Sequence, residues 1–189
     1  FSVYEFEETN INLDWTSIVL YGTKSKLGKF GYSRDHRPDK LQITVGISEL
    51  ANPINIPIGV TVNRGNVLDL EHFSDTYNQV KSKLKEGSLI IFDKGANTTD
   101  NIKSIQDSEM DYLTSMKLNT SDDKIIEKFD TERAELINSE KGLYGIKIVK
   151  PSSIKYLYFS ESLQKTQLEA KARAVMRKLK EAKEIQKAF

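Results

Sequence analysis

The feature that most constrains the fold is a short apolar run at residues 88–92 (SLIIF), which stops at Asp93. In residues 70–84, before this run, apolar side chains recur every three or four positions, the spacing of an amphipathic helix. Gly87 stands where that helix should end. A run as apolar as this one is typical of a buried strand inside a sheet, covered on both faces. A helix followed by such a strand predicts an α/β arrangement.

Further strands and helices are predicted around this run. Four other segments are rich in strand-forming residues: 11–20, 41–47, 56–62 and 111–118. The second and third of them are expected to pair antiparallel, because the turn residues Asn52 and Pro53 lie between them. Residues 97–108 predict a second helix, capped by Thr98 or Thr99. This order of elements predicts a mixed α+β fold.

The composition changes near residue 119, so the chain is expected to have two parts. Residues 1–118 would form the main domain. Residues 119–189 would form a second region with a charged helical stretch, two strands flanking Pro151 and a long, charged helix from Ser162. That helix fits a surface arm, a coiled-coil strand or an interdomain helix. Because the chain starts at Phe1 and stops inside this helix, we expect it to be a piece of a longer protein.

Composition excludes several kinds of site. The 28 basic and 27 acidic residues give a net charge of +1, so any surface that binds a polyanion has to be local. The chain has no cysteine, which excludes disulfides, thiolate zinc sites and a cysteine nucleophile. His36 and His72 are its two histidines, which leaves few candidates for a histidine-rich metal site. The sequence has no signal peptide and no apolar run that could span a bilayer, and we expect a cytoplasmic protein.

Two aspartates interrupt or end apolar strands. Asp14 lies within residues 11–20, and Asp93 directly follows residues 88–92. A carboxylate in such a place costs free energy unless a partner or a metal ion binds it. At the carboxyl end of a central strand it would point into the crevice where α/β sheets bind ligands, and its oxygens suit Mg²⁺ or Mn²⁺. A purely structural role is an equally good interpretation of both residues: Asp14 would be an ordinary strand-edge residue, and Asp93 would cap the next helix.

A resemblance to a known family changes this balance. Residues 31–42 (GYSRDHRPDKLQ) closely resemble a motif of the DDE insertion-sequence transposases of bacteria and archaea. Three more segments resemble motifs of that family and occur in its order: residues 13–17 (LDWTS), residues 56–59 (IPIG) followed by residues 64–66 (RGN) and Asp69, and residues 91–95 (IFDKG). Four motifs in the right order are far more specific than any one of them.

The resemblance implies an RNase H-like fold, a mixed five-strand sheet with helices on both sides, and Asp14 and Asp93 as catalytic, metal-binding residues on neighbouring strands. The implied reaction is phosphoryl transfer at transposon ends, by strand cleavage and strand transfer, with two Mg²⁺ or Mn²⁺ ions about 3.5–4 Å apart. Asp14 would bridge both ions. The implied partners are transposon-end and target DNA and a second copy in a homodimer, at the bacterial or archaeal nucleoid, with no membrane and no small-molecule substrate.

The third carboxylate of the family is missing from the pattern. It is a Glu within a Tyr-x-x-Arg-x-x-x-Glu motif, and neither Glu161 nor Glu169 has the Tyr and the Arg at that spacing. The segment after residue 118 instead resembles the β-rich insertion that many of these transposases carry before that Glu. We therefore expect the chain alone to be inactive. Two alternatives are an RNase H-like nuclease without strand transfer and an inactive transposase remnant that only binds DNA or a partner.

Four basic residues near the two aspartates are candidates for DNA binding: Arg34, His36, Arg37 and Lys94. Arginine can hold phosphate oxygens through two parallel hydrogen bonds. The alternatives are a structural loop in which Arg37 pairs with Asp35 or Asp39, and a solvated turn lysine at position 94. The long last helix has more basic than acidic residues, which fits a DNA-facing, a dimer-facing or a solvated surface.

Overall fold

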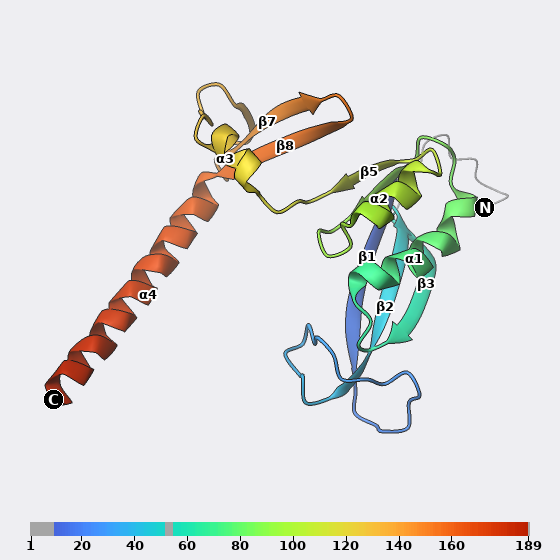
Figure 1. Ribbon diagram of the computed structural model, residues 1–189, viewed down its shortest axis with the longest axis horizontal. Helices are drawn as coiled ribbons and strands as arrows, with labels where there is room; N and C mark the ends of the chain where they lie inside the picture. The colour runs from blue at the N-terminus through green and yellow to red at the C-terminus, as the bar shows by residue number, and fades with distance from the viewer. Residues whose placement is uncertain (1–9, 52–54, 189) are drawn as a thin grey trace. The chain divides into compact units, whose positions relative to one another are not determined.

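The computed structural model describes residues 10–51 and 55–188 of the chain. The predicted turn at Asn52 and Pro53 lies outside these residues. The molecule divides into two compact units, one that ends at Lys117 and one that begins at Leu118 (Figure 1). Within the described residues, no helix is both long and apolar enough to cross a membrane.

The first unit is built on a five-stranded mixed sheet. Its strands are β1 (Asn10–Leu20), β2 (Leu41–Leu50), β3 (Ile56–Arg64), β4 (Leu89–Phe92) and β5 (Asp111–Thr114), in the spatial order β3-β2-β1-β4-β5. Strand β2 pairs antiparallel with β1 and with β3, whereas β1, β4 and β5 are parallel. The prediction of an RNase H-like mixed five-strand sheet is confirmed. The antiparallel pairing expected for β2 and β3 is also observed.

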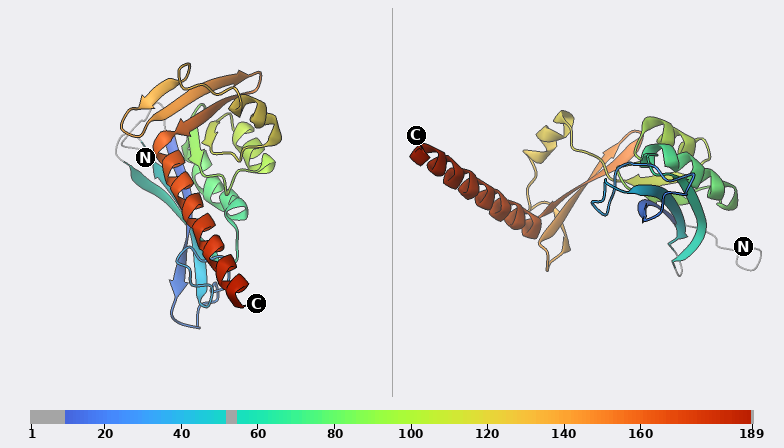
Figure 2. Two further views of the ribbon diagram at one scale, coloured as in Figure 1. Left: turned by 90° about the vertical axis from the view of Figure 1, so that its left-hand side faces the viewer. Right: turned by 90° about the horizontal axis from the view of Figure 1, so that it is seen from below.

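Helices α1 (Asp69–Val80) and α2 (Thr99–Gln106) complete this unit, with a short 3-10 turn, η1 (Lys81–Lys83), after α1. Thr98 caps α2 as predicted, because its side chain accepts a hydrogen bond from the backbone N–H of Asn101 at 3.2 Å. Phe73 and Tyr77 of α1 and Ile105 of α2 are buried in the same hydrophobic core. Both helices therefore lie on one face of the sheet (Figure 2).

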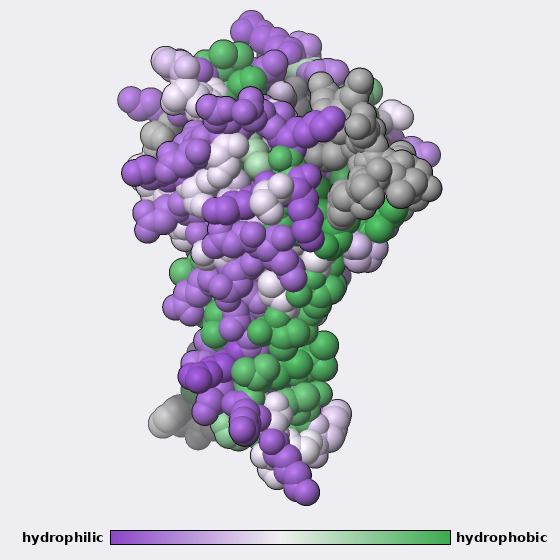
Figure 3. All heavy atoms as spheres, turned by 90° about the vertical axis from the view of Figure 1, so that its right-hand side faces the viewer, coloured by the Kyte–Doolittle hydropathy of each residue, from purple (hydrophilic) through white to green (hydrophobic). Residues whose placement is uncertain are grey.

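The opposite face of this sheet differs from the expectation. No helix of the described part of the first unit covers it, and five apolar side chains on it are between 39 and 53% exposed: Ile18, Ile47, Val60, Val62 and Leu113. Apolar side chains gather in a band on the surface in Figure 3. Strand β4 was predicted to be covered on both faces, and that prediction is wrong, since burial alternates along it. Its apolar residues reflect its inner position between two neighbours in the sheet.

The second unit contains a three-stranded antiparallel sheet of β6 (Glu135–Asn138), β7 (Leu143–Lys150) and β8 (Ser153–Ser160), with helices α3 (Thr120–Ile126) and α4 (Glu161–Ala188). The strands on either side of Pro151 and the long helix were predicted, but β6 was not, because four residues show too little alternation. From Glu161 to Gln186 every side chain of α4 is exposed. This helix is a surface helix within its own unit.

Candidate active site

Asp14 and Asp93 follow the last residue pair of the parallel ladder between β1 and β4. That pair is Leu13 and Phe92, which are 3 and 5% exposed on the core side of the sheet. Side chains alternate along a strand, and neighbouring strands lie about 4.8 Å apart. Asp14, one residue further along β1, therefore lies on the face that the helices leave open, and Asp93 directly follows the neighbouring parallel strand β4.

The carboxylates of both aspartates are accessible. The side chain of Asp14 is 79% exposed, and its Oδ1 accepts a hydrogen bond from the backbone N–H of Trp15 at 2.8 Å. Asp93 is also exposed, and its Oδ1 accepts a hydrogen bond from the backbone N–H of Gly95 at 2.8 Å, which fixes the turn after β4. Each hydrogen bond orients its carboxylate without burying it.

Asp69, the first residue of α1, is a third carboxylate at this place. A Cβ atom added to Gly95 would lie 3.0 Å from Asp93 Oδ1 and 3.1 Å from Asp69 Oδ2, so these two carboxylates flank Gly95. Burial raises the pKa of the Asp69 carboxyl above its usual range; the charge of Arg34 opposes this rise, and the charges of Asp93 and Asp14 add to it. In the sequence, Asp69 was recognisable as a motif residue without an assigned role. The sequence signal that could have identified Asp69 as a site residue was its position after the Gly-Asn turn, at the start of a helix.

Arg34 joins this group of carboxylates from the loop between β1 and β2. Its Nη2 donates a hydrogen bond of 2.7 Å to Asp69 Oδ2, and its Nη1 lies 4.0 Å from Asp14 Oδ1. The backbone N–H of Arg34 donates to Ser17 Oγ on β1 at 3.1 Å. This hydrogen bond holds the backbone of Arg34 close to the strand that carries Asp14. Of the four basic residues singled out in the sequence, Arg34 is the one found in ion-pair contact with these carboxylates.

The other three basic candidates have different surroundings. Arg37 donates two hydrogen bonds of 2.8 Å to Asp39, the structural alternative considered for this residue, and these bonds lower the pKa of Asp39 to about 2. His36 is exposed and has a positive φ of 55°. Lys94 is exposed in the turn next to Asp93. A role in DNA binding stays a prediction for all four residues.

Two of the motifs that carry the family resemblance pack against each other. A Cβ atom on Gly31 would overlap the carbonyl oxygen of Gly65, and one on Gly65 would overlap the carbonyl oxygen of Gln42. The Nε2 of the fully buried Gln42 also donates to the carbonyl oxygen of Gly65 at 3.3 Å. This close backbone approach requires glycine at both positions. It supports the loop that carries Arg34.

The donor atoms fit a hard divalent cation in part. Asp14 and Asp93 offer exposed carboxylate oxygens, the ligands that Mg²⁺ and Mn²⁺ prefer while they keep several waters. Within the described residues, no group of three His, Cys, Asp or Glu side chains is arranged to hold a metal ion. A cavity of about 240 Å³ opens next to the site, and Thr16, Arg34, Asn66, Asp69 and Gly95 are among its lining residues.

The first unit is thus an RNase H-like domain with paired carboxylates on neighbouring parallel strands. Residues 6–183 match the model of the family described as the transposase DDE domain, and the chain belongs to this family of transposases. Among solved structures, it is similar to a piggyBac transposase in a synaptic complex with hairpin DNA, with a TM-score of 0.41 and 14% identity. That match covers 80% of this chain and 32% of the piggyBac chain, so this chain spans about a third of its length. No protein of curated function matches the sequence.

Proposed function

We propose that this chain carries part of the metal-binding active site of a DNA transposase, with Asp14 and Asp93 as two of its catalytic carboxylates. The observation that carries the proposal is that both aspartates directly follow the last residue pair of the parallel β1–β4 ladder, on neighbouring strands. Membership of the transposase family supplies the class of reaction, phosphoryl transfer on DNA.

Each carboxylate has a separate task in the proposed site. Two divalent ions, Mg²⁺ or Mn²⁺, supply activation of a water or a DNA 3′-OH and stabilisation of the leaving oxygen. The carboxylate of Asp14 is 79% exposed and would serve as the ligand shared by both ions, because two close cations need an anion between them. Asp93 is oriented by the N–H of Gly95 and would hold one ion.

The proposed substrate is DNA, at transposon ends and at a target. Arg34 and Lys94 lie next to the two aspartates and are proposed to contact phosphate oxygens. His36 and Arg37 lie in the same loop as Arg34, but Arg37 already binds Asp39 and is expected to contribute least. A homodimer on DNA is proposed from the family alone.

Titration with Mn²⁺ tests the metal site. We expect the wild type to bind Mn²⁺ in isothermal titration calorimetry, and Asp14→Asn and Asp93→Asn each to weaken binding by about tenfold or more, since losing a charged ligand costs at least about 1.4 kcal/mol. Asp75→Asn is a matched control, because Asp75 is exposed on α1 and binds Asn63. Unchanged binding in the Asp14→Asn/Asp93→Asn double variant would refute the site.

An assay with paired transposon-end DNA tests the reaction. Because the family's Tyr-x-x-Arg-x-x-x-Glu motif was not found in the sequence, and no three His, Cys, Asp or Glu side chains of the described residues are arranged to hold a metal ion, we expect this chain alone to bind Mn²⁺ and DNA without forming joined products. Cleavage without joining would favour a nuclease of the same fold. Joined products made by this chain alone would show that the third carboxylate is already present.

A further inference from the structure

The guanidinium of Arg34 is shared unequally between two carboxylates. It lies 2.7 Å from Asp69 Oδ2 and 4.0 Å from Asp14 Oδ1. The side chain of Asp69 is 26% exposed, whereas that of Asp14 is 79% exposed. The cation is therefore bound to the more sheltered carboxylate and stands just outside hydrogen-bond distance of the open one.

This arrangement matters because a guanidinium and a divalent ion compete for the same carboxylate oxygens. The backbone of Arg34 is fixed to Ser17, so its side chain has both Asp69 and Asp14 within reach. A short charge-assisted hydrogen bond is considerably stronger than an ion pair at 4.0 Å without one. The guanidinium of Arg34 is therefore held more strongly by Asp69 than by Asp14.

We propose that Asp69 is a positioning residue that keeps Arg34 off Asp14 and so leaves Asp14 available to a divalent ion. The inference rests on the proposed metal site at Asp14 and Asp93. Asp69 is a poor third ligand in this arrangement, because its Oδ2 already accepts the 2.7 Å hydrogen bond from Arg34.

The test compares Asp69→Asn in two backgrounds, the wild type and Arg34→Met, with Mn²⁺ affinity as the readout. In the wild-type background we expect about tenfold weaker binding, because the released guanidinium moves to Asp14; this lies within the usual coupling of contacting residues. In the Arg34→Met background we expect a loss of no more than about threefold, since the change then removes only a nearby negative charge that does not bind the ion. Asp69→Glu should restore affinity to within about threefold of the wild type, because it returns a carboxylate to Arg34.

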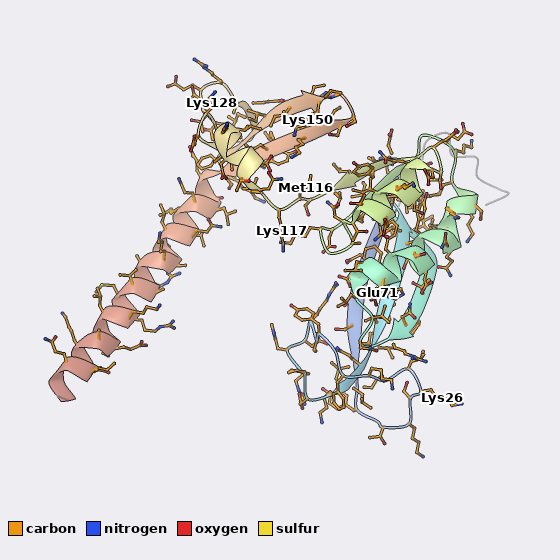
Figure 4. All side chains as sticks on the ribbon, in the orientation of Figure 1. Lys26, Glu71, Met116, Lys117, Lys128 and Lys150 are labelled. Carbon is orange, nitrogen blue, oxygen red and sulfur yellow. The ribbon has the colours of Figure 1, made fainter. Side chains whose placement is uncertain are left out.

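The control is Glu71→Gln, a change of the same charge in the same first turn of α1, at an exposed residue labelled in Figure 4. It should leave Mn²⁺ affinity within about twofold in both backgrounds, because an exposed charge further from the site is screened. Fluorescence of Trp15, the chain's one tryptophan and fully buried in the core, verifies that each variant is folded.

The possible outcomes are distinct. An equal or larger loss in the Arg34→Met background would overturn the inference and make Asp69 a ligand or a simple through-space charge. No loss in the wild-type background would overturn it as well. If Mn²⁺ binding did not depend on Asp14 and Asp93 at all, the proposed function would be refuted, and the role proposed for Asp69 would be refuted as well.

Discussion

The two units of this molecule differ in how they bury apolar side chains. In the first unit Trp15, Phe73 and Tyr77 are at most 1% exposed and pack against one another in one core. In the described part of the second unit no large apolar side chain is buried to a similar degree, and Tyr156 and Tyr158 are 48 and 55% exposed. The second unit is held mainly by strand pairing, an aromatic contact between Phe129 and Phe159, and further polar contacts.

This difference shows where the candidate site gets its rigidity. Burying a large apolar side chain contributes about 1.5–3 kcal/mol, so the first unit has a stable core of its own. The buried Leu13 and Phe92 directly precede Asp14 and Asp93 and anchor the strand ends that carry them. The candidate site therefore depends on the packing of the first unit.

The largest effect that tests this comparison is expected from a core truncation. Phe73→Ala should destabilise the first unit by about 3–5 kcal/mol, because it leaves a cavity among Trp15, Tyr77 and Phe92. Phe159→Ala, in the half-buried aromatic pair of the second unit, should cost about 1 kcal/mol. Urea unfolding followed by Trp15 fluorescence and by circular dichroism measures both. Equal losses of unfolding free energy in the two variants would mean that buried aromatic side chains stabilise both units to the same extent.

A smaller effect is expected from adding one methyl group to a glycine. Gly65→Ala should cost about 1–3 kcal/mol, because the new Cβ meets the backbone carbonyl oxygens of Gln42 and Lys29, which cannot move independently. Gly145→Ala in the second unit should cost less, since its Cβ meets the flexible end of Ile137. Thermal unfolding of both variants checks the order. A larger loss for Gly145→Ala would contradict it.

Mild acid is expected to weaken the first unit selectively, because the buried His72 lies in it. Burial lowers the pKa of His72, whose Nε2 is 2.9 Å from Thr61 Oγ1. The folded state thus favours neutral His72, and this stability is complete above the usual value of 6.5 and declines as the pH falls below it. Urea unfolding at pH 7.5 and pH 5.5 should show a larger loss for the wild type than for His72→Gln. An identical loss in both proteins would rule out His72 as the cause.

The smallest effect is expected on α4. Arg177 and Glu181 form an exposed ion pair on this helix with a distance of 3.9 Å, so Arg177→Ala should change stability by no more than about 0.5 kcal/mol. Trp15 fluorescence should be unaffected. Helix content from circular dichroism checks the local effect, and a large loss of helix would show that α4 depends on this contact.

The types of most elements could be predicted from the sequence, because these signals are local. The periodic spacing of Phe73, Tyr77 and Val80 indicated α1, and Thr98 indicated the start of α2. Asp14 and Asp93 were singled out because a carboxylate within or directly after an apolar strand costs free energy, and the family resemblance then favoured them as site residues. The short β6 gave too weak a pattern to be found.

The tertiary structure decided what no local pattern contains. The parallel register of β1 and β4 puts Asp14 beside Asp93, and the Arg34–Asp69 contact joins residues 35 positions apart. The placement of α1 and α2 on one face of the sheet also depends on packing in the core. Local conformation follows from neighbouring residues along the chain, whereas the distances between charges that determine the chemistry of a site follow from how distant segments pack.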